Sequence, residues 1–399
     1  MMDLPIYMDG HATTRVDPRV VEAMVPFFSQ HYGNAASRQH RFGWVARDAV
    51  ADARAAVASL IGAKASEVIF TSGATESNNL AVRGVVDASR ARGNHIVTVQ
   101  TEHRAILDPC ASLERQGMQV SYLPVREDGI LTPAALGAAI EPTTVLVTVM
   151  MANNETGVLH PIDALAALTR ARGISFHTDA AQAAGWVPID VETSGIDLLS
   201  LTAHKCHGPK GVGGLFVRHG VAVTPLIEGG GHESGLRSGT LNLPAIVGFG
   251  RAASICLNEM AGESVRVGRL RDRLLSQLQN SLQGVTVNGS MKARLPQNLN
   301  VSIDGVNGEQ LLMGLGGVAV SSGAACTSNT RKPSHVLQAL GLSDKQARAS
   351  VRFGLGRFNS EAEVDQVAEM FQGLVEQLRA PAPVFEQEHS ENDLPPEWQ

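Results

Sequence analysis

The chain has 399 residues, 44% of them hydrophobic, so it can bury a large core and is long enough for two domains. Charged residues make up 18% and the formal net charge is -6, with lysines and arginines dispersed, which argues against a protein that binds nucleic acid or a membrane surface. The chain has no apolar run of transmembrane length and no N-terminal signal segment, so we expect a cytoplasmic protein.

The first half of the chain alternates short apolar segments with longer helical ones. Helices are expected over residues 44–60, 77–91 and 161–171. Strands are predicted at residues 67–71, 95–99, 120–123, 144–149, 174–178, 197–201 and 213–217. This alternation is typical of an α/β domain around a mostly parallel sheet, in which ligands bind where strands end and helices begin.

The pattern changes near residue 245. The sequence predicts a long helix over 243–283, strands at 285–288 and 299–303, and further helices to about residue 379. Strands of this kind between helices indicate a second, smaller α+β domain.

These patterns divide the chain into three parts. We expect a large domain over residues 15–262, which would bind the ligand. A small domain is expected to combine residues 1–14 with residues 263–380. The remaining tail, 381–399, is acidic and contains prolines, so we expect it to be flexible.

The four cysteines lie far apart and form no CxxC motif, so no disulfide framework is expected. One local group, His204, Cys206 and His207, has ligand types that zinc prefers. These side chains would have to converge within a single turn, and no second pair of ligands follows. We therefore predict no metal site.

Polar clusters follow several of the predicted strands. Residues 72–78 follow the first strand and open a helix, where backbone N–H groups and the helix N-terminus can hold an anion. An ordinary helix-capping turn explains this segment equally well. His103 follows the next strand and can stack on an aromatic cofactor or move protons near neutral pH. A lone histidine is nevertheless more often a structural residue.

Two further clusters offer hydrogen bonds and charge. Asn154 follows a third strand and can bind a ligand oxygen, although asparagine is also common in turns. Asp179 follows a fourth strand. A carboxylate there can hold the proton of a pyridinium nitrogen, or it can simply cap the next helix.

Lys205 ends a fifth strand, just before a glycine-rich turn. Burial lowers the pKa of an ammonium group, so a lysine in this place can become a neutral amine that forms a Schiff base with pyridoxal phosphate (PLP). Strand-ending lysines are more often surface charges. An anion cradle, a histidine, a carboxylate and a lysine are together the groups that PLP chemistry needs, and this combination favours a PLP site.

The order of these motifs resembles the NifS/IscS-type cysteine desulfurases, which are fold-type-I PLP enzymes of the class V aminotransferase family. The shared motifs are SGATES, TEH, NNE, DAAQ and HK, in that order along the chain. The similarity extends from Met8 to Phe358. It implies a PLP-dependent transferase fold, with a mostly parallel sheet in the large domain and a smaller α+β domain.

The resemblance also implies roles around the cofactor ring. Lys205 would carry PLP, and Asp179 would hold the proton on the ring nitrogen. His103 would stack on the ring and deprotonate the substrate thiol. Asn154 and Gln182 would flank the ring oxygen.

By the same resemblance, other residues would anchor the phosphate and the substrate. The phosphate would be held by Ala74, Thr75, Thr202, His204 and, from the other subunit of a homodimer, Thr240. The substrate carboxylate would be bound by Asn34 and Arg352, and a guanidinium group matches a carboxylate with two hydrogen bonds.

Cys326 lies in a run of small and hydroxyl residues, 321–328, whose composition fits an exposed loop with an accessible thiol. Most cysteines are buried instead. The resemblance implies that Cys326 attacks the substrate sulfur, carries the persulfide, and hands sulfur to an iron-sulfur cluster or transiently ligates one. Cys110, Cys206 and Cys256 are interpreted as bystanders.

The chain departs from the family pattern at a few positions. Gly10 and His11 stand where the family often has Tyr-Ser or a similar pair, and Cys206 replaces a larger apolar residue. Ala35 replaces a common proline. None of these changes removes a group that the chemistry needs.

The sequence therefore predicts a PLP-dependent cysteine desulfurase that converts L-cysteine to L-alanine. It would be a cytoplasmic homodimer that supplies sulfur to an iron-sulfur scaffold protein or, through another acceptor, to tRNA thiolation, without direct contact with nucleic acid or membrane. Three alternatives stay open: a selenocysteine lyase, another PLP aminotransferase or decarboxylase of the same fold, and a non-catalytic assembly protein.

Overall fold

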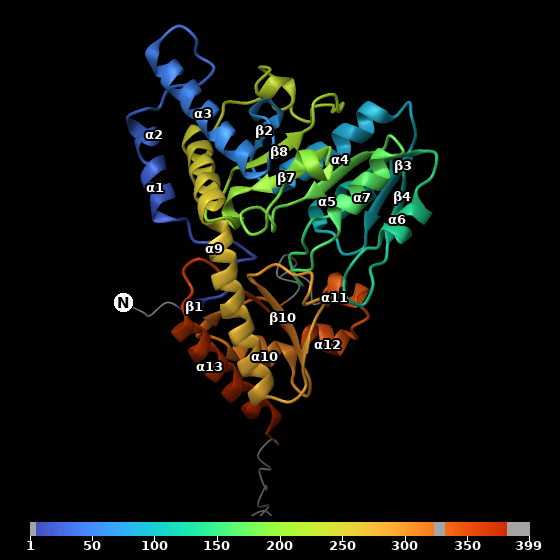
Figure 1. Ribbon diagram of the computed structural model, residues 1–399, viewed down its shortest axis with the longest axis vertical. Helices are drawn as coiled ribbons and strands as arrows, with labels where there is room; N and C mark the ends of the chain where they lie inside the picture. Colours follow the sequence, from blue (N-terminus) through green and yellow to red (C-terminus); the bar gives the residue numbers. More distant parts are fainter. Residues whose placement is uncertain (1–4, 323–331, 381–399) are drawn as a thin grey trace, which may run out of the picture.

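The computed structural model describes residues 5–322 and 332–380. Its strands form a large sheet in one part of the molecule and two small sheets in the other (Figure 1). The helix α9 (Leu243–Ser281) runs without interruption from beside the large sheet to the small sheets. Because α9 passes through residue 262 as one helix, the domain boundary at that residue stays a prediction.

The large sheet has seven strands in the order β2-β8-β7-β6-β5-β3-β4. The strands β7, β6, β5, β3 and β4 are parallel neighbours, whereas β8 pairs antiparallel with both β2 and β7. The predicted mostly parallel sheet is thus confirmed. Its strands are β2 (Val68–Thr71), β3 (His95–Val99), β4 (Gln119–Leu123), β5 (Thr144–Thr148), β6 (Ser175–Asp179), β7 (Leu198–Thr202) and β8 (Gly213–Val217).

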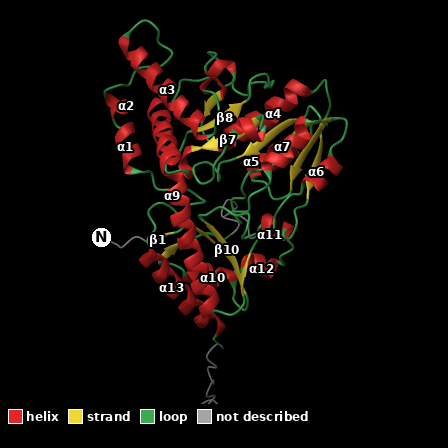
Figure 2. Ribbon diagram, in the orientation of Figure 1, coloured by secondary structure: helices red, strands yellow, loops and turns green. Residues whose placement is uncertain are grey.

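Successive side chains along each of these buried strands lie on opposite faces of the sheet. Leu198 of β7 belongs to a core on one face, together with apolar residues of α4 (Ala74–Ser89) and α5 (Arg104–Glu114). Leu199 belongs to the core on the other face, which α9 also joins. The sheet is therefore a layer between helices (Figure 2). The other helices of this part are α1 (Pro18–Met24), α2 (Pro26–Ser29), α3 (Arg41–Leu60), α6 (Pro133–Ala139), α7 (Ile162–Arg170) and α8 (Val191–Ser194).

The helix α4 begins at Ala74, three residues before the predicted start. Gly73 makes the early start possible, because its φ of 152° is open to glycine and strained for other residues. Consequently Ala74, Thr75 and Glu76 belong to the first turn of the helix and not to a loop before it.

The second part of the molecule contains an antiparallel sheet of the order β12-β10-β9 and a short parallel pair. In the pair, β1 (Ile6–Tyr7) lies beside β11 (Val318–Ala319), so the start of the chain joins its last third. The sheet strands are β9 (Val285–Val287), β10 (Asn298–Ile303) and β12 (Ser350–Gly354). Helices around them are α10 (Gly308–Gly314), α11 (His335–Ala339), α12 (Asp344–Arg348) and α13 (Glu361–Arg379).

Within the described part of the chain, no helix is both long and apolar enough to cross a membrane.

Candidate active site

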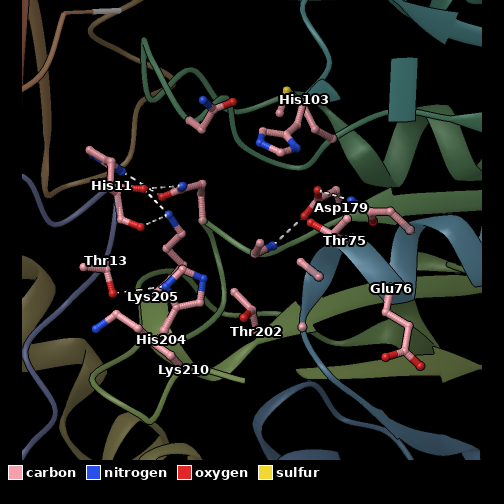
Figure 3. A pocket seen from close by; sticks show the side chains of 18 of the residues that line it. His11, Thr13, Thr75, Glu76, His103, Asp179, Thr202, His204, Lys205 and Lys210 are labelled. Carbon is pink, nitrogen blue, oxygen red and sulfur yellow. Dashed lines mark hydrogen bonds between the residues drawn. The ribbon is translucent and has the colours of Figure 1, made fainter. Parts of the chain in front are cut away.

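A cavity of about 500 Å³ opens where β5, β6 and β7 end and α4 begins. Ligands of parallel sheets bind at this edge, where the carboxyl ends of the strands lie. The N-terminal segment around His11 and one arginine of the small sheet, Arg352 of β12, complete its wall. Figure 3 shows these side chains converging from different elements. Among the lining residues are the predicted site residues Ala74, Thr75, His103, Asn154, Asp179, Gln182, Thr202, His204, Lys205 and Arg352.

The first turn of α4 gives the cavity an anion-binding corner. Gly73, the N-cap residue, has no side chain to satisfy the helix N–H groups, so those donors stay available to a ligand. A Cβ placed on Gly73 would lie 3.8 Å from the hydroxyl of Thr202, which shows how close β7 comes to this corner. Thr75 lines the same cavity. The corner therefore combines backbone N–H groups with two hydroxyl groups.

His204 follows β7 and lines this cavity too. Burial, followed by the positive charges of Lys205 and Lys210, lowers the pKa of His204 to about 4. Its Nδ1 lies 3.2 Å from the hydroxyl oxygen of Thr13. Near pH 7 the imidazole is therefore neutral and can offer a ligand one N–H donor.

Lys205 reaches across the cavity to the N-terminal segment. Its Nζ donates a hydrogen bond of 2.7 Å to the carbonyl oxygen of Ala12 and another to that of His11 (Figure 3). Both acceptors are neutral backbone groups. The amine is thus placed inside the cavity by the main chain of residues far away in the sequence.

Asp179 ends β6 with its carboxylate fixed on both sides. Oδ2 accepts a hydrogen bond of 2.7 Å from Nδ2 of Asn78, and Oδ1 accepts one of 2.9 Å from the backbone N–H of Ala181. The second bond lies within a local turn, because residues 181–186 form turns and the next helix, α8, begins only at Val191, so the alternative role of Asp179 as a helix cap is wrong. The first is not local, and it holds the carboxylate against the wall of the cavity. Asn78 was not predicted as a site residue.

His103 lies on the opposite side of the cavity from Lys205 (Figure 3). Its Nδ1 accepts a hydrogen bond of 3.1 Å from Ala105, so the side chain also caps α5. Its neighbour Glu102 is fully buried and receives a 2.5 Å hydrogen bond from the backbone N–H of Met150. Burial, with the negative charge of Asp179 adding to it, raises the pKa of Glu102 well above its usual range. A buried carboxyl group next to His103 was not predicted.

Arg352 is 1% exposed and already has partners. Nη2 donates to Asp9 over 2.8 Å and Nη1 donates to the carbonyl oxygen of Asn154 over 2.9 Å. Its Nε is buried and has no hydrogen-bond partner among the described residues. A substrate carboxylate would therefore compete with Asp9 for the guanidinium group.

Two of the predicted residues that the structure describes are not brought to this cavity. Asn34 and Thr240 are both exposed and are absent from its lining. The side-chain oxygen of Asn34 accepts a local hydrogen bond of 2.9 Å from Ala36. Cys326 lies outside the described residues.

Glu76 and Lys210 also line the cavity, although neither was predicted as a site residue. Glu76 forms a 2.8 Å ion pair with Arg237, which stands three residues before Thr240. The pair neutralises a carboxylate that would otherwise repel an anion in the corner beside it. It also ties the segment that carries Thr240 to the first turn of α4.

The three described cysteines are buried. Burial raises the pKa of Cys110 to about 12, so its thiol is not ionised near neutral pH. Across residues 5–322 and 332–380, the histidines, cysteines and carboxylates form no group of three that could hold a metal ion.

Comparison with known proteins gives consistent results over nearly the whole chain. A family profile described as Aminotransferase class-V matches residues 6–367. The chain is 54% identical over 387 residues to "Cysteine desulfurase IscS" of Anaeromyxobacter sp. (strain Fw109-5), covering 96% of both chains. It is 48% identical over 395 residues to "Cysteine desulfurase IscS" of Rickettsia akari (strain Hartford), covering 98% of this chain and 96% of the relative.

Solved structures agree with these sequence matches. A protein described as "NIFS-LIKE PROTEIN" superposes with a TM-score of 0.88 at 36% identity, covering 94% of this chain and 100% of that one. A structure titled "SspA in complex with cysteine" superposes with a TM-score of 0.80 at 35% identity, covering 89% and 100%.

Proposed function

The chain belongs to the aminotransferase class-V family, and we propose that it is a PLP-dependent cysteine desulfurase, which converts L-cysteine to L-alanine and passes the sulfur to an acceptor. The observation that carries this proposal is the cavity that unites Lys205, Asp179 and the open first turn of α4. The high identity to IscS cysteine desulfurases supports it over the same-fold aminotransferase and selenocysteine lyase readings.

The residues present fit PLP in charge and in donor type. The N–H groups of α4 and the hydroxyls of Thr75 and Thr202 suit a phosphate, and the carboxylate of Asp179 suits a protonated ring nitrogen. When bound, PLP supplies an electron sink for negative charge on the substrate Cα. Ala74 and His204 would complete the phosphate site, and Asn154 and Gln182 would lie beside the ring oxygen.

The amine of Lys205 would bind the cofactor covalently and, once released, would remove the Cα proton of the substrate. Its two carbonyl partners, those of His11 and Ala12, give the released amine a defined resting place inside the cavity. Arg352 would hold the substrate carboxylate, and His103 would take the proton from the substrate thiol. The thiolate of Cys326 would then attack the substrate sulfur. The bond between that sulfur and the substrate Cβ would break with its electron pair staying on the carbon, which takes up a proton and leaves as alanine, and the sulfur would remain on Cys326 as a persulfide.

Exposed aromatic side chains support a homodimer. Phe28 is 65% and Tyr32 is 64% exposed, and Phe42 and Trp44 at the start of α3 are about half exposed. The ring centroids of Tyr32 and Phe42 are 5.4 Å apart, so these two side chains form one apolar patch. Because large apolar patches on a protein surface mark interaction sites, we propose that a second copy of the chain covers this one. Asn34 lies within the same stretch of sequence and would be brought to the partner's site.

Complementation between subunits tests the dimer proposal. Thr240→Val should weaken PLP binding roughly tenfold, because a donor to the charged phosphate is lost. Mixing Thr240→Val subunits with Lys205→Ala subunits should restore one native site per mixed dimer, measured as cofactor affinity by fluorescence titration. As the matched control, a Lys205→Ala/Thr240→Val partner should restore nothing. Equal affinity in both mixtures would refute cross-subunit phosphate binding.

The desulfurase reaction itself is tested by product analysis. Purified holoenzyme with L-cysteine and a thiol reductant should release alanine and sulfide in equal amounts, measured by amino-acid analysis and methylene-blue formation. A ketoacid product without sulfide would identify an aminotransferase instead. A much higher rate with selenocysteine than with cysteine would identify a selenocysteine lyase.

For the acceptor, we propose an iron-sulfur scaffold protein in the cytoplasm. The end of the chain, 393–398, loosely resembles the family tail that docks such a scaffold, and it lies outside the described residues. A transfer assay of labelled persulfide sulfur to purified candidate acceptors would identify the partner.

A further inference from the structure

A row of buried polar side chains leads from the small sheet to the cavity. It starts at Arg294, passes through Asn298 at the beginning of β10 and His11 in the N-terminal segment, and ends at Gln182 in the cavity wall. All four are at most 7% exposed. Along this row, the donors and acceptors of each residue determine which atom of the following residue donates a hydrogen bond.

The orientation of Asn298 is fixed first. Its Oδ1 faces Nη1 of Arg294 over 3.0 Å, and a guanidinium group can only donate. Its Nδ2 faces the carbonyl oxygen of Glu155 over 3.1 Å, which can only accept. Burial, followed by the charge of Arg271, lowers the pKa of Arg294 to about 9, so the group is still charged near pH 7. The amide of Asn298 therefore cannot flip without losing both bonds.

Gly157 makes room for this amide. A Cβ at Gly157 would lie 2.4 Å from the side chain of Asn298, and the glycine has a φ of 71°. The backbone next to Glu155 is thus shaped to accept the asparagine side chain.

The tautomer of His11 follows from Asn298. Nδ2 of Asn298 lies 3.0 Å from Nε2 of His11, so Nε2 must accept and the proton must reside on Nδ1. Burial, and then the positive charges of Arg352, Lys205 and Arg294, lower the pKa of His11 to about 3, so the ring stays neutral. The side-chain hydrogen bond with Gln182 opposes this shift only in part.

The orientation of Gln182 follows from His11. Nδ1–H of His11 donates to Oε1 of Gln182 over 2.8 Å, and Nε2 of Gln182 donates back to the carbonyl oxygen of His11 over 3.1 Å. The amide nitrogen carries two hydrogens, and the second has no acceptor among the described residues. Gln182 is therefore held with a spare donor, and not its oxygen, available to the cavity.

We infer that His11 is a positioning residue: with Arg294 and Asn298 it forms a donor relay that presents an N–H of Gln182 to the ring oxygen of the cofactor. This inference rests on the proposed function, because it needs PLP in the cavity. A donated hydrogen bond favours the ionised ring oxygen, so the relay lowers the pH at which the bound cofactor gives up its proton. His11 is one of the positions at which the chain departs from its family's usual residues.

Two nearly isosteric variants test the relay in the holoenzyme. In His11→Asn the side-chain amide can still donate to Oε1 of Gln182. The proton affinity of the bound cofactor, measured from the pH midpoint of its visible absorbance, should therefore stay within about twofold of the wild-type value. In His11→Asp an acceptor faces Oε1 and turns the amide of Gln182 over. The pH midpoint should then rise, because the proton affinity of the bound cofactor increases about tenfold or more. PLP should also bind more weakly in a fluorescence titration.

A Gln182→Ala background separates the relay from a simple charge effect. There the difference between His11→Asn and His11→Asp should largely vanish, because no amide remains to be turned. Should His11→Asp fail to fold, His11→Leu should raise the midpoint in the same direction and by less. Equal midpoints in the Asn and Asp variants, or a difference that persists undiminished without Gln182, would overturn the relay. A wild-type protein without a visible band would instead refute the proposed function.

Discussion

We expect Lys205→Ala to abolish turnover of L-cysteine and the covalent attachment of PLP. The amine of Lys205 is placed in the cavity by the carbonyl oxygens of His11 and Ala12, and alanine leaves no nucleophile at that point. Borohydride should reduce a yellow cofactor irreversibly onto the wild-type chain and leave the variant chain unlabelled, as intact-mass spectrometry would show. The expected loss of rate is several orders of magnitude, since attachment and proton removal depend on the same group.

Lys210 provides the matched control, because it is the second lysine lining the cavity. Lys210→Ala should retain the borohydride-reducible linkage, with the label on the peptide that contains Lys205. If Lys205→Ala were still labelled while Lys210→Ala was not, the assignment of the covalent lysine would be reversed.

The second large effect is expected for Cys326→Ser. The variant should bind PLP and L-cysteine normally, because the thiol takes no part in those steps. It should form almost no alanine or sulfide, since a serine hydroxyl is not ionised near neutral pH and is a poor nucleophile toward sulfur. Wild-type enzyme treated once with cysteine should carry one additional sulfur atom on the Cys326 peptide, removable by a reductant.

Cys110 serves as the control for this experiment. Its thiol is buried and its pKa is raised to about 12, so it cannot act as a thiolate near neutral pH. Cys110→Ala should therefore leave the added sulfur on Cys326. An added sulfur on Cys206, or alanine release by Cys326→Ser at the wild-type rate, would contradict the persulfide mechanism.

The strands were predictable because their signals are local. β3 and β8 have the predicted bounds, β2, β4 and β5 differ by one residue at one end, and β6 and β7 are shifted by one residue at both ends. Side chains placed directly after those strands had to meet at one sheet edge, which is why Asp179 and Lys205 could be selected together. The start of α4 was misplaced because the φ of Gly73 depends on its surroundings.

The relay could not be predicted in the same way. His11 meets Gln182 across 171 positions and Asn298 across 287 positions of the sequence. Gln182 was selected through the DAAQ motif, but no local pattern connects it with His11 or Asn298. Asn34 and Thr240 present a different difficulty, because both are exposed in a single chain. The role predicted for Thr240 needs a second chain, and we propose the same for Asn34.

The pairing of β1 with β11 has a consequence for synthesis on the ribosome. Ile6 cannot find its partner until Val318 has emerged, and Asp9 cannot bridge to Gly354 until later still. The large sheet, which ends at Val217, can form long before that. Because these early segments pair with distant ones, the small part can close only after residue 354 has been synthesised. Until then the start of the nascent chain stays unpaired and open to chaperones.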